Sequence, residues 1–317
     1  MKAKKDMASL RRLINQQLKS FGYEITKEKK RNFVNPDRLE KADKYLERYR
    51  EIISDPLNML IQKVPEAGYV DKMGCVILHN GNRVPIEGPL AYYKDFSDIL
   101  VINRGVHEPL EEFCFQQAIE KLNITNPNML ELGCYWAHYS MWFMKAFPNA
   151  TCFMVEPDPD NIKCGKNNFE INHLKGEFIR SFVGNSGFKV DAFLSEKGLS
   201  GIDLLHSDIQ GFEVEMLEGA SDLLNRKAAK YAFVSTHSQD LHRSVVEVLS
   251  SFGYRIEVSA DVDFETTSSD GFVLASSPLV EPVFQNFKPL GRTAIARSSS
   301  SEIGHFIANT MSRISQK

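Results

Sequence analysis

Apolar and polar positions divide the chain into three regions with different spacing. Residues 1–65 carry apolar positions at helical intervals, residues 66–127 hold short apolar runs between turns, and later residues alternate between apolar runs and amphipathic stretches. Such alternation is typical of a parallel sheet covered by helices. The strands predicted in this third region are residues 128–132, 150–156, 177–183, 202–207, 230–236, 254–258 and 271–276.

The first region predicts a helical N-terminal extension over residues 1–65. Asn35 and Pro36 supply a cap and a first turn for one of its helices. The basic N-terminus carries a second apolar helical face, formed by Leu10, Leu13, Ile14 and Leu18. This face favours a docking helix, and a homodimer formed through the N-terminal helices is one arrangement that it allows. A targeting or membrane-surface helix is the alternative, although the stretch lacks the continuous apolar core of a signal peptide.

The second region predicts short strands at residues 75–79 and 99–102, with a turn at residues 80–82. In the third region we expect one seven-stranded sheet whose last strand, residues 271–276, runs antiparallel to the others. The loop before that strand, residues 259–270, has no room for a crossover helix, and a hairpin joins two strands with few residues. The predicted α/β domain therefore spans residues 66–279, and residues 280–317 form a C-terminal tail with a short terminal helix.

The segment from Met129 to Ser140 is the most informative part of the chain. An apolar run ends at Gly133, an amphipathic stretch follows, and the next apolar run ends at Glu156. An acid at the end of the second strand is where parallel α/β sheets bind ribose hydroxyls. The loop lacks G-x-G-x-x-G and so has no cradle for a pyrophosphate, which favours S-adenosylmethionine over a dinucleotide. An ordinary buried βαβ unit without a ligand is the alternative.

Three further polar clusters follow or precede predicted strands. Asp208 comes at the carboxyl end of one strand and His237 at that of another, where open α/β sheets place their ligands. His107 and Glu108 precede Pro109 just upstream of the sheet. Each cluster also has a purely structural interpretation, because Asp208 could cap the next helix, His237 could satisfy a turn, and His107 with Glu108 could simply begin a helix.

Composition excludes several classes of protein. The net charge of −3 gives no reason to expect nucleic acid as a partner. The five cysteines show no C-x-x-C pair, which indicates a reducing compartment, hence the cytoplasm, without disulfides or structural zinc. No apolar stretch approaches the roughly 18 residues that a transmembrane helix needs.

Several motifs, in their order along the chain, resemble the FkbM-type methyltransferases, a Rossmann-like branch of the S-adenosylmethionine-dependent enzymes. They are Glu131-Leu-Gly133, Val155-Glu-Pro-Asp158, Val183-Gly-Asn185, the block at residues 202–213, Leu217-Glu-Gly-Ala220 and Thr236-His-Ser238. The resemblance covers roughly residues 100–276. It implies a Rossmann-like class I methyltransferase fold and a transferase that uses S-adenosylmethionine. One departure is the loop Gly133-Cys-Tyr-Trp-Ala137, where many members have Gly-Ala-Asn-x-Gly.

The resemblance also implies roles for individual residues. Those expected to contact the cofactor are Glu131, Gly133, Tyr135, Ala137, Glu156, Pro157, Val183, Gly184 and Asp208. Those expected to contact the acceptor are Glu108, Trp136 and Gln210. The family acts on varied acceptors, often hydroxyls of sugars or secondary metabolites, so the expected partner is a small molecule or a glycan.

Methyl transfer to a hydroxyl requires the acceptor oxygen, the methyl carbon and the sulfur to lie in line. A base within hydrogen-bond reach activates the hydroxyl, and His237 is the first candidate because histidine titrates near neutral pH. His107 is the second candidate, and Asp208 is expected to orient the cofactor or the acceptor. A divalent metal held by Asp208 and His237 is a weaker alternative. A dinucleotide-dependent oxidoreductase and a catalytically silent scaffold with this fold also remain open.

Overall fold

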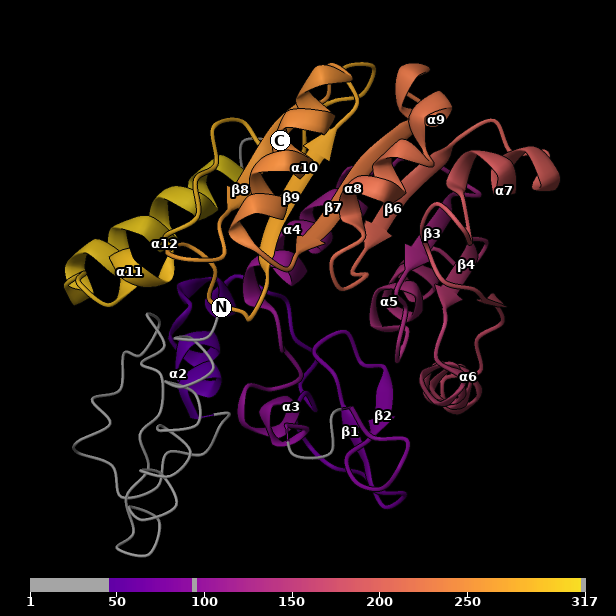
Figure 1. The fold of residues 1–317 in the computed structure, drawn as a ribbon. Helices are drawn as coiled ribbons and strands as arrows, with labels where there is room; N and C mark the ends of the chain where they lie inside the picture. The colour runs from indigo at the N-terminus through magenta and orange to yellow at the C-terminus, as the bar shows by residue number, and fades with distance from the viewer. Residues whose placement is uncertain (1–45, 93–95, 315–317) are drawn as a thin grey trace, which may run out of the picture. The chain divides into compact units, whose positions relative to one another are not determined.

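The structure is a computed structural model that describes residues 46–92 and 96–314 (Figure 1). From Arg48 onward the chain forms one compact unit. Three predictions concern residues outside the described ranges: the cap at Asn35, the apolar face around Leu13 and the homodimer formed through the N-terminal helices.

Short elements precede the main sheet. They are α2 (Leu46–Ser54), the 3₁₀ helix η2 (Pro56–Met59), β1 (Cys75–Ile77), β2 (Arg83–Pro85), α3 (Asp98–Ile102) and α4 (Pro109–Lys121). The side chain of Asp55 caps η2 by accepting a hydrogen bond from the amide of Leu57 at 2.9 Å. Strands β1 and β2 pair antiparallel around the turn that holds Gly81 at a φ of +79°, so the predicted strand and turn near residue 80 are confirmed.

The strand predicted at residues 99–102 is wrong, because this segment is the helix α3. Ile99 and Leu100 are buried, whereas Val101 and Ile102 are 38% and 57% exposed. A run of four apolar residues has no period that distinguishes a strand from one turn of helix. Asp98 in the first turn favours the helix, because a negative charge at that end is stabilised by the helix dipole.

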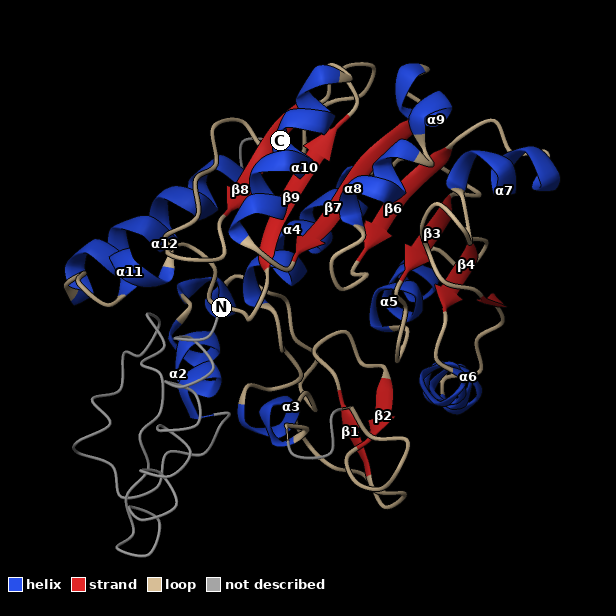
Figure 2. Ribbon diagram, viewed as in Figure 1, coloured by secondary structure: helices blue, strands red, loops and turns tan. Residues whose placement is uncertain are grey.

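The main sheet has seven strands and lies between two layers of helices (Figure 2). Its strands are β3 (Asn128–Leu132), β4 (Thr151–Glu156), β5 (Glu177–Arg180), β6 (Ile202–Ser207), β7 (Ala229–Thr236), β8 (Arg255–Ala260) and β9 (Gly271–Ser276). The order across the sheet is β5-β4-β3-β6-β7-β9-β8. Strand β9 pairs antiparallel with both β7 and β8, so the predicted antiparallel last strand is confirmed, as is the Rossmann-like, mostly parallel fold.

The helices that follow the strands are amphipathic and cover both faces. They are α5 (His138–Ala146), α6 (Pro159–Ile171), α7 (Val190–Lys197), α8 (Glu213–Glu218), α9 (Ser221–Asn225) and α10 (Gln239–Ser251). Side chains of α7 to α10 share one apolar core with the strands, which includes Phe193, Leu217 and Leu249. On the opposite face, Phe115 of α4 packs against Phe233 of β7 at a ring-centroid distance of 5.7 Å.

The C-terminal residues pack onto this second face. They form α11 (Arg292–Ile295) and α12 (Ser300–Ile314), so the predicted terminal helix exists and is longer than expected. Phe284 and Phe287 lie 5.7 and 5.4 Å from the ring of Phe113 in α4. These aromatic contacts tie the tail to the α/β unit. Within the described ranges, no helix has the length and apolar character needed to cross a membrane.

Candidate functional site

Four of the predicted site residues directly follow or end strands at one edge of the sheet. Gly133 follows β3, Glu156 ends β4, Asp208 follows β6 and His237 follows β7. Strands β3 and β6 are neighbours. The chain continues from β3 to β4 on one side of this pair and from β6 to β7 on the other side, so the two connections diverge between them. Open α/β sheets bind ligands in the crevice at such a switch point.

Gly133 makes a tight turn directly after β3. Its φ is +75°, and a Cβ atom at this position would lie 1.7 Å from the carbonyl oxygen of Asp208. The amide of Asp208 in turn donates to the carbonyl of Leu132 at 2.9 Å. The loops after β3 and β6 are therefore in direct backbone contact, which only a residue without a side chain permits.

The loop after Gly133 and the loop after Asp208 both contain strained backbone. Tyr135, Ala137 and Gln210 have φ values of +42°, +59° and +56°, which disfavour residues with a side chain. Ala137 is fully buried and directly precedes α5 in a left-handed conformation. The loop thus makes a close turn at Ala137 without a glycine there.

Glu156 is 5% exposed, and its carboxylate organises the loops on either side. One oxygen accepts hydrogen bonds from the amide of Asp158 at 3.0 Å and the side chain of Asn161 at 3.2 Å. The other oxygen accepts from the amide of Tyr135 at 3.2 Å. The carboxylate is therefore fixed in position at the mouth of β4.

A cavity of about 880 Å³ opens beside these residues. Predicted residues that line it are Gly133, Tyr135, Glu156, Pro157, Val183, Asp208 and Gln210. Residues that the sequence did not indicate also line it: Pro89, Leu90, Ala91, Asp160, Asn161, Lys163, Cys164, Phe182, Ile209 and Phe212. Phe182 and Phe212 meet edge to face at 4.5 Å and give one end of the cavity an aromatic wall. We refer to this space as the first cavity.

A second cavity of about 200 Å³ adjoins the first and shares four lining residues with it, namely Gly133, Tyr135, Asp208 and Gln210. The other predicted residues on its walls are His107, Glu108, Glu131 and Trp136. Its remaining walls come from Arg48, Tyr92, Cys134, His138, Tyr139, His206, Ser269 and Asp270. Of the predicted site residues, Ala137, Gly184 and His237 line neither cavity.

His237 is enclosed by acidic side chains. Its Nδ1 lies 2.6 Å from Oε1 of the fully buried Glu213, and its Nε2 lies 3.0 Å from Oδ1 of Asp208 and 3.7 Å from Oδ1 of Asp270. Partial burial by itself lowers the pKa of His237, but the hydrogen bonds to Asp208 and Glu213 outweigh it and raise the pKa to about 10. Both ring nitrogens are engaged and the ring is cationic at neutral pH, which disfavours the predicted role of His237 as the base.

Replacing His237 by glutamine should destabilise the protein by about 3 kcal/mol at pH 6, because the buried Glu213 and the partly exposed Asp208 lose their cation. The pKa of His237 is about 10 in the folded state and near 6.5 in the unfolded state. The charged ring therefore stabilises the fold fully below pH 6.5, and this stabilisation is lost as the pH rises to 10. Urea unfolding at several pH values should therefore show a difference between the two proteins that shrinks toward pH 10. The exposed His305→Gln variant is the control, and a pH-independent difference would contradict the ion cluster.

Glu108 and His107 form a second titratable pair on the wall of the second cavity. Nε2 of His107 lies 3.4 Å from Oε2 of Glu108, which also accepts a hydrogen bond from the hydroxyl of Tyr139 at 3.3 Å. Burial raises the pKa of Glu108 to about 8, against the opposing charge of His107. Burial lowers the pKa of His107, but the charges of Glu112 and Glu108 outweigh it and raise that pKa above its usual value. Glu108 is thus a carboxylate that titrates near physiological pH.

On the same wall, Glu131 and His206 lie in register on neighbouring strands. The carboxylate of Glu131 accepts a hydrogen bond from the amide of Ser140 at 3.1 Å, and burial raises its pKa. Glu131 therefore fixes the start of α5. His206 was not among the predicted site residues, although it belongs to the polar run at the end of β6. Its ring lies 4.2 Å from that of Tyr139, and Nε2 lies 2.5 Å from Oε1 of Glu111.

Comparison with known proteins identifies one family and several similar proteins. Residues 186–256 match the model of the methyltransferase FkbM domain. The 2-O-methyltransferase NoeI of Sinorhizobium fredii is 22% identical to this chain, over 47% of the chain and 82% of NoeI.

Solved structures of similar fold include other methyltransferases. One is TrmK of M. capricolum in complex with S-adenosyl-homocysteine, with 12% identity, coverage of 64% of this chain and 84% of that chain, and a TM-score of 0.37. Another is the O-methyltransferase of Bacillus cereus in complex with the same compound, with 14% identity, coverage of 54% and 82%, and a TM-score of 0.39.

The FkbM match runs from the loop before α7 into β8. It therefore contains Asp208, Gln210 and His237, which are the residues at the ends of β6 and β7. The resemblance that the sequence motifs indicate is confirmed over residues 186–256, which match the methyltransferase FkbM domain.

Proposed function

We propose that the protein transfers a methyl group from S-adenosylmethionine to a hydroxyl of a sugar, a glycan or a secondary metabolite. The observation that carries this proposal is the pair of adjoining cavities that meet at Gly133, Tyr135, Asp208 and Gln210. A cofactor in one cavity and an acceptor in the other would face each other across this junction, as an in-line displacement requires. The similarity to NoeI, which is named as a 2-O-methyltransferase, supports an oxygen acceptor.

The first cavity suits an adenosyl group. Glu156 lies where the ribose hydroxyls would bind, and the aromatic wall of Phe182 and Phe212 offers apolar surface for the adenine. Asp208 lies at the junction of the two cavities, where its carboxylate would face the positively charged methionyl end. Burial opposes ionisation of Asp208, but the hydrogen bond from His237 holds its pKa below the usual value, so it is negatively charged at neutral pH.

The second cavity suits the reacting part of the acceptor. At about 200 Å³ it is smaller than the pockets that hold a whole drug-sized ligand, so most of a larger acceptor would lie outside it. Glu108 borders this cavity and would accept the proton of the hydroxyl, while His107 would position Glu108. His237 would act indirectly, as the cation that keeps Asp208 charged and in place.

Isothermal titration with S-adenosylmethionine and with NAD tests the cofactor. We expect binding of S-adenosylmethionine only. Binding of NAD alone would indicate an oxidoreductase, and binding of neither would indicate a silent scaffold. Incubation with labelled S-adenosylmethionine and a panel of glycans and cell extracts would then identify the acceptor class.

The Glu156→Ala variant should bind S-adenosylmethionine at least about tenfold more weakly, because hydrogen bonds to a charged group contribute roughly 1.5–3 kcal/mol. Titration calorimetry gives the dissociation constant, and circular dichroism verifies the fold. Glu170→Ala on α6, an exposed position outside both cavities, is the control. Equal affinities of the folded Glu156→Ala variant and the parent would exclude Glu156 from the ribose site.

A further inference from the structure

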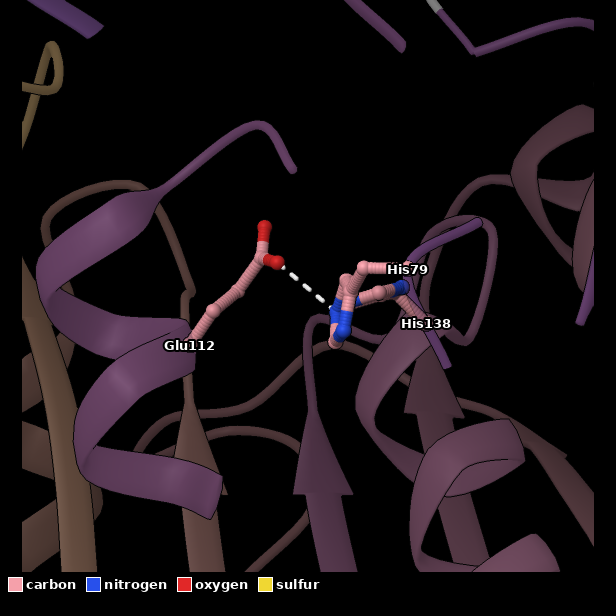
Figure 3. A group of neighbouring side chains, drawn as sticks. All are labelled: His79, Glu112 and His138. Carbon is pink, nitrogen blue, oxygen red and sulfur yellow. Dashed lines mark ion pairs between the residues drawn. The ribbon is translucent and has the colours of Figure 1, made fainter. Parts of the chain in front are cut away.

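Three side chains that the proposed reaction does not use converge behind the second cavity (Figure 3). His79 lies between β1 and β2, Glu112 lies on α4, and His138 is the first residue of α5. One nitrogen of each histidine and one oxygen of Glu112 all lie within 4.8 Å of one another, and all three residues are buried. Figure 3 shows both rings on one side of the carboxylate, with Glu112 directed toward them.

Apart from Oε1 of Glu112, the polar side-chain atoms of this group have no hydrogen-bond partner among the described residues. Both ring nitrogens of His138 are buried and unsatisfied, as are those of His79 and Oε2 of Glu112. Nε2 of His79 lies 2.8 Å from Oε2 of Glu112, without the geometry of a hydrogen bond. A buried polar atom left unsatisfied costs roughly 1–3 kcal/mol, so several of them at one point indicate a missing partner.

The carboxylate of Glu112 is held in position from its other side. Its Oε1 accepts hydrogen bonds from the amides of His107 at 2.8 Å and Glu108 at 3.0 Å, and lies 2.6 Å from Nδ1 of His107. These contacts leave Oε2 directed at the two histidines. Outer contacts that orient a ligating carboxylate in this way are a regular feature of protein metal sites.

We propose that His79, Glu112 and His138 form a binding site for a divalent metal ion of the zinc type. Two imidazole nitrogens and one carboxylate oxygen are a ligand set that zinc accepts, with a fourth position left for water or another group. The proposal is independent of the methyl-transfer reaction.

The observed spacing is close to what a metal requires. Bonds of about 2.0–2.1 Å in a tetrahedral site place ligand atoms about 3.3 Å apart. His79 and Glu112, now 2.8 Å apart, would separate slightly, and the three ligand atoms already lie within 4.8 Å of one another. A cavity of about 350 Å³ lined by His79, Lys63 and Gln116 leads to the group from one side, and the second cavity reaches His138 from the other. The ion would join three segments far apart in sequence and support the wall that carries His107 and Glu108.

Elemental analysis of the full chain, purified without chelator and then dialysed against zinc, should find about one zinc per chain. His138→Phe, a substitution of similar shape, should retain less than about a tenth of it, whereas His305→Phe on α12, where the histidine is exposed, should retain all of it. Cobalt in place of zinc should give the visible absorption of a tetrahedral site in the parent and not in His138→Phe. Absence of stoichiometric zinc in the parent, or equal zinc in both variants, would overturn the proposal.

A measurement on the unmodified protein covers the case in which His138→Phe does not fold. Removal of metal with a chelator should lower the melting temperature, and added zinc at about 100 times its dissociation constant should restore it by about 5 °C or more. Magnesium at the same concentration should have no effect, because imidazole is a poor ligand for it. A melting temperature that does not respond to chelator and zinc would contradict the site without any substitution.

Discussion

Replacing Gly133 by alanine should abolish binding of S-adenosylmethionine and lower the stability of the fold by more than about 4 kcal/mol. The added methyl group would lie 1.7 Å from the carbonyl oxygen of Asp208, and the φ of +75° disfavours any side chain. The clash involves backbone on both sides, so it can be relieved only by separating the loops after β3 and β6. That separation would open the junction of the two cavities. Titration calorimetry and urea unfolding measure the two effects.

Gly74 provides a matched control for this substitution. Its φ of +74° is nearly the same, but a Cβ atom there would have nothing within 4 Å. Gly74→Ala should therefore cost only the backbone strain of about 1–2 kcal/mol and leave cofactor binding unchanged. If both alanine variants lost the same stability and kept cofactor binding, the contact between Gly133 and Asp208 would not matter for the site.

Replacing Glu108 by glutamine should reduce turnover by about 10²–10⁴ while S-adenosylmethionine still binds with its normal affinity. Glu108 lines only the second cavity, so its loss affects the acceptor side. Burial raises the pKa of Glu108 to about 8, and the base acts in its deprotonated form. Turnover of the parent should therefore rise with pH through about 8, and this rise should be missing in Glu108→Gln.

Two comparisons make the assignment of Glu108 specific. Glu218→Gln at the exposed end of α8 should have normal turnover and a normal pH profile. His237→Gln, measured at a pH where it is folded, should keep the rise through pH 8 even if its turnover is lower, because it removes a positioning residue. If the rise in turnover through pH 8 were missing in His237→Gln and present in Glu108→Gln, His237 would again be the better candidate for the base.

Several strands of the main sheet could be predicted well from the sequence. The predicted ranges of β3, β6 and β9 coincide with the observed ones, because strands buried on both faces are continuous apolar runs with clear ends. Strand β5, predicted as residues 177–183, ends at Arg180, where its side chains are half-buried or exposed and the apolar pattern is weak. Helix α3 differs from the predicted strand because its apolar run is too short to show whether apolar positions repeat at helical or at strand intervals.

The positions of the candidate site residues could be predicted where these residues follow or end strands. They could not be predicted where segments distant in sequence come together. Gly133, Glu156 and Asp208 lie at carboxyl ends of strands, a position that the alternation of elements already fixes. Arg48 and Asp270 reach the second cavity from opposite ends of the chain, and no local pattern indicates this. The two carboxylates around His237 likewise depend on tertiary packing, and the sequence does not indicate that they raise the pKa of its ring.

The insertion of β9 between β7 and β8 affects how the chain can assemble during synthesis. Among the described residues, strand β8 pairs only with β9, so it cannot join the sheet until residues 271–276 have left the ribosome. Until then the edge of β7 is open, and its residues from Tyr231 to Thr236 are all buried in the finished sheet. Unpaired apolar edges promote association between chains. Nascent or truncated chains that end before Gly271 are therefore the form of this protein most exposed to aggregation and most dependent on chaperones.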